Sequence, residues 1–212
     1  MPVIRILISD DHAIVREGIK QILADTNDLV AAGEAASGHD VLEQVRREDW
    51  DMVLLDLAMP GKDGLETLKE IKKEKPKLPV LVLSIYPEEQ YAVRALKAGA
   101  SGYLTKESAP EELIAAIRKV SQGGKYISAS LAEKLASHLG VDAEKPVHES
   151  LSDREYQVML LIASGKTVSE IADDMCLSVK TVSTYRLRAL SKMGMKNNAT
   201  FTYYAIKHGL IK

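Results

Sequence analysis

The sequence predicts a doubly wound α/β domain with a five-stranded parallel sheet, joined by a linker to a small all-α domain. Over residues 1–122, short apolar runs alternate five times with helical patterns, whereas residues 149–212 carry only closely spaced helical patterns. The length of 212 residues also suits two modest domains that each bury a core. We therefore predict domains at residues 1–122 and 149–212, with a linker at residues 123–148.

The first domain is expected to contain five strand–helix units. The strands are expected at residues 4–9, 30–36, 52–56, 79–84 and 102–105. The helices are expected at residues 13–24, 40–48, 65–73, 88–98 and 110–122. Right-handed crossovers between parallel strands place helices on both faces of the sheet. The flavodoxin-like strand order 2-1-3-4-5 then puts the ligand crevice at the carboxyl ends of strands 1 and 3.

Polar side chains follow four of these strands and are expected to converge at that edge: Asp10, Asp11, Asp56, Ser84 and Lys106. Taken singly, the acid pair could cap a helix, the serine could belong to a turn, and the lysine could be a solvated surface residue. Charges at the ends of buried strands are costly unless they are paired or bind a metal. The group as a whole therefore indicates a site for a divalent cation and a phosphoryl group.

The chemistry of this group follows from its three carboxylates. Neighbouring carboxylates raise one another's pKa unless a hard cation lies among them. Mg²⁺ is the natural candidate, because it prefers oxygen ligands and retains several waters. Asp56 could then attack a phosphoryl donor and form an aspartyl phosphate, while Mg²⁺ and Lys106 offset the negative charge.

Residues 1–122 resemble the receiver domain of bacterial response regulators, through Asp10-Asp11, residues 56–64, Ser84 and residues 99–106. The resemblance implies that Asp56 is the phosphoacceptor and that Lys106 pairs with the phosphoryl group. It implies a switch in which Ser84 binds a phosphoryl oxygen and the Tyr103 ring rotates from solvent towards the core. The alternative for Tyr103 is an ordinary half-buried aromatic residue. The implied ligands of Mg²⁺ are Asp10, Asp11, Asp56 and the backbone carbonyl of Ala58.

Composition predicts a reduced, cytoplasmic protein. The single cysteine, Cys176, cannot form an internal disulfide, and its apolar neighbours favour a buried structural thiol over a reactive one. The first residues do not have the pattern of a secretory signal, and no apolar run approaches the roughly 18 residues of a membrane span. In the linker, residues 128–139 have a helical pattern, which leaves open whether the linker is a flexible spacer or a helix that contacts a domain.

The second domain has the local signals of a helix-turn-helix. Ser152 with Glu155 and Thr167 with Glu170 form predicted capping boxes, which begin two helices. Ser178 is the expected N-cap of a helix at residues 180–193. The short helix that begins after Thr167 and this helix are joined by a tight turn at residues 177–179, as in a helix-turn-helix. A last helix is expected at residues 199–208, capped by the pair at 197–198 and ended by a glycine.

The charge of this half predicts a polyanionic partner. Residues 1–122 hold 16 Lys and Arg against 21 Asp and Glu, whereas residues 149–212 hold 9 against 6, so the two ends favour different partners. Residues 178–212 contain seven Lys and Arg and no acidic residue, which is typical of a nucleic-acid-binding surface. A solvated polar helix face would explain the hydroxyls of residues 181–185 but not this excess of cations.

Residues 149–212 resemble the LuxR-type DNA-binding domain of the NarL/FixJ response regulators, through residues 151–155, 168–172, 177–182 and 192–194. The resemblance implies that the second helix of the motif lies in the major groove of duplex DNA. Tyr185 departs from the histidine common there. The last helix would mediate dimerisation, for which Phe201, Thr202 and Ala205 are candidates, with core packing an equal alternative for Phe201. The implied DNA contacts are Lys180 and Thr181 to phosphates, and Ser183, Thr184 and Leu187 to bases. From their charge, Arg188 and Lys192 are also expected to neutralise phosphates.

Together the two halves predict a two-component transcription factor and not an enzyme. A sensor histidine kinase would phosphorylate Asp56, and the phosphorylated homodimer would bind a promoter. An aspartyl-phosphate hydrolase is the enzymatic alternative, but its motif has a second aspartate where this chain has Ala58. A receiver that responds to partner binding instead of phosphate is a third possibility.

Overall fold

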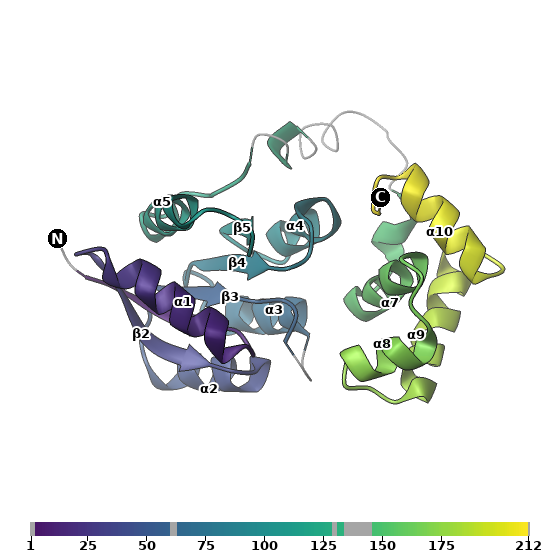
Figure 1. The fold of residues 1–212 in the computed structure, drawn as a ribbon, viewed down its shortest axis with the longest axis horizontal. Helices are drawn as coiled ribbons and strands as arrows, with labels where there is room; N and C mark the ends of the chain where they lie inside the picture. Colours follow the sequence, from purple (N-terminus) through teal and green to yellow (C-terminus); the bar gives the residue numbers. More distant parts are fainter. Residues whose placement is uncertain (1–2, 60–62, 129–130, 134–145, 212) are drawn as a thin grey trace. The chain divides into compact units, whose positions relative to one another are not determined.

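The computed structural model describes residues 3–59, 63–128, 131–133 and 146–211 (Figure 1). The chain divides into two compact units, Met1–Leu135 and Ala136–Lys212. The helices of the described segments are too short or too polar to traverse a lipid bilayer.

The first unit is built around a five-stranded parallel sheet with the order β2-β1-β3-β4-β5, which confirms the predicted topology (Figure 1). Its strands are β1 (Ile4–Ser9), β2 (Leu29–Ala35), β3 (Met52–Leu55), β4 (Val80–Ser84) and β5 (Gly102–Thr105). Its helices are α1 (Ala13–Ala24), α2 (Gly38–Arg47), α3 (Gly64–Glu74), α4 (Glu88–Lys97) and α5 (Pro110–Ser121).

Both faces of this sheet are buried, as expected for parallel strands. On one face, alternate strand residues such as Ile8 and Leu54 pack against Leu23 of α1 and Ile117 of α5. The intervening residues of the central strands β3 and β4, among them Val53, are also buried, whereas edge strand β2 is partly exposed. The contacts of α2 with α3 and of α3 with α4 complete a second helical layer. The sheet is therefore sandwiched between helices, and only its strand ends are free to form a site.

Two boundaries differ from the predicted ones, and the first of them affects the site. Strand β3 ends at Leu55, so Asp56 lies just beyond the strand and not within it. Helix α2 begins at Gly38, two residues earlier than predicted, because the Ser37 side chain accepts a hydrogen bond from the Asp40 N–H. Because Asp56 follows the last residue of β3, the direction of its side chain is not fixed by the alternation of side chains between the two faces of the sheet.

The segment after α5 packs along the edge strand β5. Tyr126 forms a single parallel bridge with Gly102, its N–H donates to the carbonyl of Ser101 at 2.9 Å, and its hydroxyl donates to Glu112 at 2.9 Å. Ser128 donates to the carboxylate of Glu88 at 2.8 Å. These contacts protect part of an exposed sheet edge. Most of the helix predicted at residues 128–139 lies outside the described residues.

The second unit contains only helices in the part of the chain that the structure describes. These are a turn of 3-10 helix at Val147–Ser150, α7 (Asp153–Ala163), α8 (Val168–Asp174), α9 (Val179–Lys192) and α10 (Asn198–Lys207). Both predicted capping boxes are present, and Ser178 and Asn197 cap α9 and α10 as predicted. Phe201, Tyr156 and Val182 are among the fully buried side chains of its core.

The prediction that Cys176 is buried is wrong, because its side chain is exposed. Helix α8 ends in a motif in which the N–H of Cys176 donates to Asp173 and the N–H of Leu177 donates to Ala172. This motif requires a left-handed residue, and Cys176 has a φ of 52°. The turn buries Met175 but directs the cysteine to solvent.

Candidate functional site

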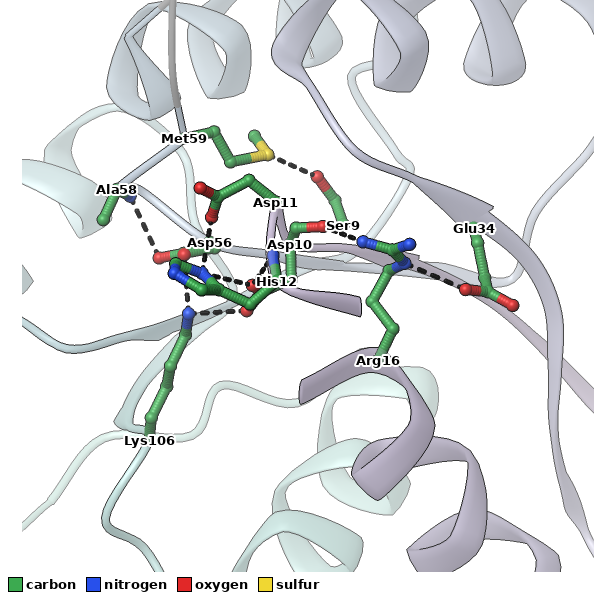
Figure 2. Close-up of polar contacts among 10 residues, drawn as sticks. All are labelled: Ser9, Asp10, Asp11, His12, Arg16, Glu34, Asp56, Ala58, Met59 and Lys106. Carbon is green, nitrogen blue, oxygen red and sulfur yellow. Dashed lines mark hydrogen bonds and ion pairs between the residues drawn. The ribbon is translucent and has the colours of Figure 1, made fainter. Parts of the chain in front are cut away.

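The carboxyl edge of the sheet brings together Asp10, Asp56 and Lys106 from three different strand ends (Figure 2). The two aspartates are each 1% exposed. The Lys106 Nζ lies 2.5 Å from Asp10 Oδ2 and 2.7 Å from Asp56 Oδ2, so one ammonium bridges two buried carboxylates. The predicted convergence of these three side chains is confirmed.

The backbone holds the other oxygen of each carboxylate. Asp10 Oδ1 accepts a hydrogen bond from the His12 N–H at 2.8 Å, and Asp56 Oδ1 accepts one from the Ala58 N–H at 3.0 Å. Helix α1 begins after His12 without a side-chain cap, so the acid pair does not serve as a helix cap. Arg16 also donates to the Asp10 carbonyl at 2.7 Å (Figure 2). The position of each carboxylate is therefore set by hydrogen bonds to nearby backbone groups.

Asp11 lies beside this group with an oxygen that lacks a hydrogen bond. Its Oδ1 is buried, and the ring Nδ1 of His12 lies 2.8 Å from it. Within the described segments, Asp10, Asp11 and His12 form a group whose possible ligand atoms all lie within 4.8 Å of one another. Asp56 is not in that group. His12 was not singled out in the sequence, although its position directly after the acid pair could have suggested it.

Burial and charge shift the pKa values of this site. Burial raises the pKa of Asp56, and the negative charge of Asp10 adds to this, although the Ala58 N–H and Lys106 oppose it. Burial disfavours the charged form of Lys106, but its hydrogen bonds to Asp10 and Asp56 outweigh burial and raise its pKa. A buried carboxylate whose pKa is raised, such as that of Asp56, is stabilised in its charged form by an added cation. The oxygen ligands and the unsatisfied Asp11 oxygen therefore fit a hard divalent ion.

Ser84, at the end of β4, and Tyr103, on β5, both form hydrogen bonds with the backbone of Tyr86 in the loop after β4. Ser84 is fully buried, and its Oγ accepts a hydrogen bond from the Tyr86 N–H at 3.3 Å. The Tyr103 hydroxyl donates to the Tyr86 carbonyl at 2.8 Å. The Tyr103 ring is 2% exposed, so it lies in the inward position, and the alternative of a half-buried ring is wrong. Burial raises the pKa of Tyr103 well above its usual range.

One face of α9 in the second unit is exposed. Lys180, Thr184, Leu187 and Arg188 are exposed, whereas Val182, Ala189 and Leu190 pack into the core. Ser183 is half-buried. Thr181 is half-buried too, and its hydroxyl contacts that of the N-cap Ser178 at 2.7 Å. Of the seven predicted DNA contacts, five are exposed, including Lys192, and Thr181 and Ser183 are partly covered.

Two cations of α9 have partners within the domain. Arg186 donates to Asn198 at 2.6 Å, at the start of α10. Lys192 donates to Glu155 at 2.6 Å, and Glu155 is 3% exposed. Burial opposes the charge of Glu155, but Lys192 and the Ser152 N–H outweigh burial and lower its pKa. Lys192 therefore stabilises the capping box of α7, in addition to its predicted contact with DNA.

The substitution Lys192→Met is expected to lower the free energy of unfolding by about 1 kcal/mol at neutral pH, because Glu155 loses its charged partner while Lys192 itself is partly screened by solvent. Since the folded pKa of Glu155 is depressed, this stabilisation is present above the ordinary value of 4.5 and is lost as the pH falls through the folded pKa. Thermal unfolding between pH 3 and 7 measures the effect. The exposed Lys196→Met is the matched control, and an equal loss in both variants would contradict a specific role for Lys192.

The candidate dimerisation residues of α10 need a correction. Phe201 and Ala205 are fully buried in the core of the second unit, so they cannot contact another copy of the chain. The exposed apolar residues of this helix are Tyr203, which is 70% exposed, and Ile206, which is 56% exposed. Thr202 is half-buried.

The fold and both sites define a class of protein. A doubly wound domain with an acidic and lysine site at the strand ends, together with a basic helix-turn-helix unit, is typical of a signal-dependent transcription regulator. Residues 6–118 match the response regulator receiver domain, and residues 149–205 match the bacterial regulatory proteins of the luxR family. The chain belongs to the NarL/FixJ-type family of two-component response regulators, whose members are DNA-binding transcription regulators and not enzymes.

Similar proteins extend over nearly the whole chain. The response regulator UvrY of Escherichia coli K12 is 38% identical over 208 residues, which cover 98% of this chain and 95% of UvrY. The response regulator GacA of Pseudomonas aeruginosa is 39% identical over 210 residues, with 98% of each chain covered. A solved structure of RcsB from Salmonella enterica serovar Typhimurium, bound to promoter rprA with the phosphomimetic BeF3⁻, matches with a TM-score of 0.64 and 28% identity and covers 95% of this chain and 98% of that one.

Proposed function

We propose that this cytoplasmic protein accepts a phosphoryl group on Asp56 from a sensor histidine kinase, and that this modification controls dimerisation and promoter binding. The observation that carries the proposal is the Lys106 ammonium held between the buried Asp10 and Asp56 carboxylates. A phosphoryl group on Asp56 would add negative charge next to this cation. Lys106 is therefore placed to pair with the group once the Asp56 bond has formed.

Mg²⁺ would be held by Asp10, Asp11, Asp56 and the carbonyl of Ala58. The fit is supported by the buried Asp11 Oδ1, which lacks a hydrogen bond, and by the oxygen-rich set of donors. When bound, the ion would neutralise charge on the incoming phosphoryl group. Asp56 supplies the attacking carboxylate oxygen, and its hydrogen bond from Ala58 orients the other oxygen away from the reaction.

Ser84 and Tyr103 would form the switch. The Ser84 hydroxyl accepts from the Tyr86 N–H and is hydrogen-bonded to the Tyr103 side chain, and it would turn to donate its hydrogen to a phosphoryl oxygen. A pull on Ser84 would move the loop that contains Tyr86. The Tyr103 hydroxyl donates a hydrogen bond to the Tyr86 carbonyl in that loop, so the inward Tyr103 ring would stabilise the shifted position of the loop.

The second unit would bind duplex DNA as a homodimer, with residues 1–122 as the receiver, 123–148 as the linker and 149–212 as the DNA-binding domain. The exposed Lys180 and Arg188 support contacts with phosphates. RcsB dimers have been solved on DNA, and the exposed Tyr203 and Ile206 of α10 offer a corresponding apolar contact between two copies of this chain. Thr181, Ser183, Thr184, Leu187 and Lys192 complete the proposed DNA contacts.

The test is selection of bound fragments from random duplex DNA, with and without a small phosphodonor and Mg²⁺. The expected result is a two-fold symmetric motif, enriched more strongly when the phosphodonor is present. Equal enrichment in both arms would favour the alternative in which the receiver responds to a partner. No enrichment in either arm would contradict promoter binding.

A further inference from the structure

The middle of the exposed face of α9 is apolar. Leu187 is 59% exposed, although the helix already places Val182, Ala189 and Leu190 in the core. Thr184 lies three residues before Leu187 on the same face. Its hydroxyl donates to the Lys180 carbonyl at 2.9 Å, one helical turn back. With the hydroxyl turned to the backbone, the methyl group is the part of Thr184 that remains for a partner.

The charged neighbours of this patch show what kind of partner it fits. Lys180 and Arg188 are exposed on either side of Thr184 and Leu187 along the same face. Arg186 and Lys192 are instead bonded to Asn198 and Glu155. A two-residue apolar patch between cations is suited to the floor of a DNA groove, where the cations contact the phosphates and the patch contacts base edges.

We propose that Leu187 and the Thr184 methyl group recognise thymine through its C5 methyl group. This inference rests on the proposed binding of duplex DNA. In the major groove only thymine presents a methyl group, and apolar side chains contact it. Leu187 has no hydrogen-bonding group, and the hydroxyl hydrogen of Thr184 is donated to the Lys180 carbonyl, so neither side chain donates to a polar base edge. The centre of each half-site should therefore contain A·T pairs.

Replacement of thymine by uracil tests the proposal, because uracil lacks only the methyl group. The probe is the tightest duplex selected from random DNA by the full chain, resynthesised with deoxyuridine in place of every thymidine in the half-sites. We expect the thymine duplex to bind about fourfold more tightly for each thymine methyl group that the protein covers, the factor that corresponds to burial of one methylene-sized group. The ratio of the two dissociation constants at one salt concentration is the readout.

Three variants assign the ratio to these side chains. Leu187→Ala should reduce the ratio of the two affinities, while its binding to the uracil duplex remains near that of the unmodified chain. Thr184→Ser keeps the hydroxyl and loses the methyl group, so it should reduce the ratio. Thr184→Val keeps a methyl group in place and should preserve it. Val147→Ala, an exposed apolar residue outside α9, should leave both affinities unchanged.

The outcomes separate this inference from the proposed function. Tight binding with equal affinity for the thymine and uracil duplexes would overturn the role of Leu187 and leave promoter binding intact. A thymine preference that persists in both Leu187→Ala and Thr184→Ser would assign it to other residues and would also overturn the inference. Failure of the full chain to bind any selected duplex would instead contradict the proposed function.

Discussion

The substitution Asp56→Asn is expected to abolish phosphoryl labelling by acetyl phosphate in the presence of Mg²⁺. The amide has nearly the shape of the carboxylate but no anionic oxygen to attack phosphorus. The unsubstituted chain should gain one phosphoryl group, and the variant none. Intact-mass spectrometry of both proteins under identical conditions measures the difference.

A matched control separates loss of the acceptor from loss of the fold. Glu43→Gln removes an exposed carboxylate that pairs with Arg47, outside the group around Lys106. It should be labelled normally. Circular dichroism should give both variants the spectrum of the unmodified chain. If Asp56→Asn is labelled as well as the parent protein, the acceptor is another residue.

The affinity for duplex DNA is expected to fall steeply with added salt, roughly a hundredfold between 50 and 200 mM, if a dimer places about four cations on phosphates. The fall arises because each Lys or Arg that neutralises a phosphate releases condensed counterions. Lys180 and Arg188 are the exposed cations of α9 that would bind these phosphates. Titrations of the selected duplex at several salt concentrations give the slope of log affinity against log salt.

The variant Arg188→Ala provides the internal control for this measurement. It should weaken binding to all sequences about equally, and it should reduce the slope by about one for each phosphate that the arginine no longer neutralises. Leu187→Ala should leave the slope unchanged, since leucine carries no charge. A flat salt profile for the unsubstituted chain would contradict phosphate binding by this surface.

The meeting of the charged side chains at the strand ends was largely predictable from sequence because topology decides which strand ends meet. Asp10, Asp56 and Lys106 follow three different strands, and a parallel sheet with right-handed crossovers brings those ends to one edge. The detailed contacts were not predictable. The bridging position of Lys106 and the place of His12 beside Asp11 depend on side-chain rotamers, which local patterns do not encode.

For α9 and α10 the sequence predicted the helices and their charged residues, but not the state of each side chain. The pairing of Lys192 with Glu155 joins residues 37 positions apart. The short helix α10 carries apolar residues on two faces, so periodicity did not decide that Phe201 would be buried and Tyr203 exposed. Cys176 was misjudged because its neighbours are apolar, whereas the left-handed end of α8 decides its direction.

The sequence by itself determined the two units, the order of the elements, the caps of the helices and the charged residues of both sites. These depend on periodicity, propensity and capping, which act over a few residues along the chain. Only the tertiary structure decided which oxygen of each aspartate meets Lys106, which cations of α9 remain exposed and which face of α10 is buried. Those outcomes depend on packing between segments that are distant in the chain, and packing selects among side-chain positions that the local sequence leaves equally accessible.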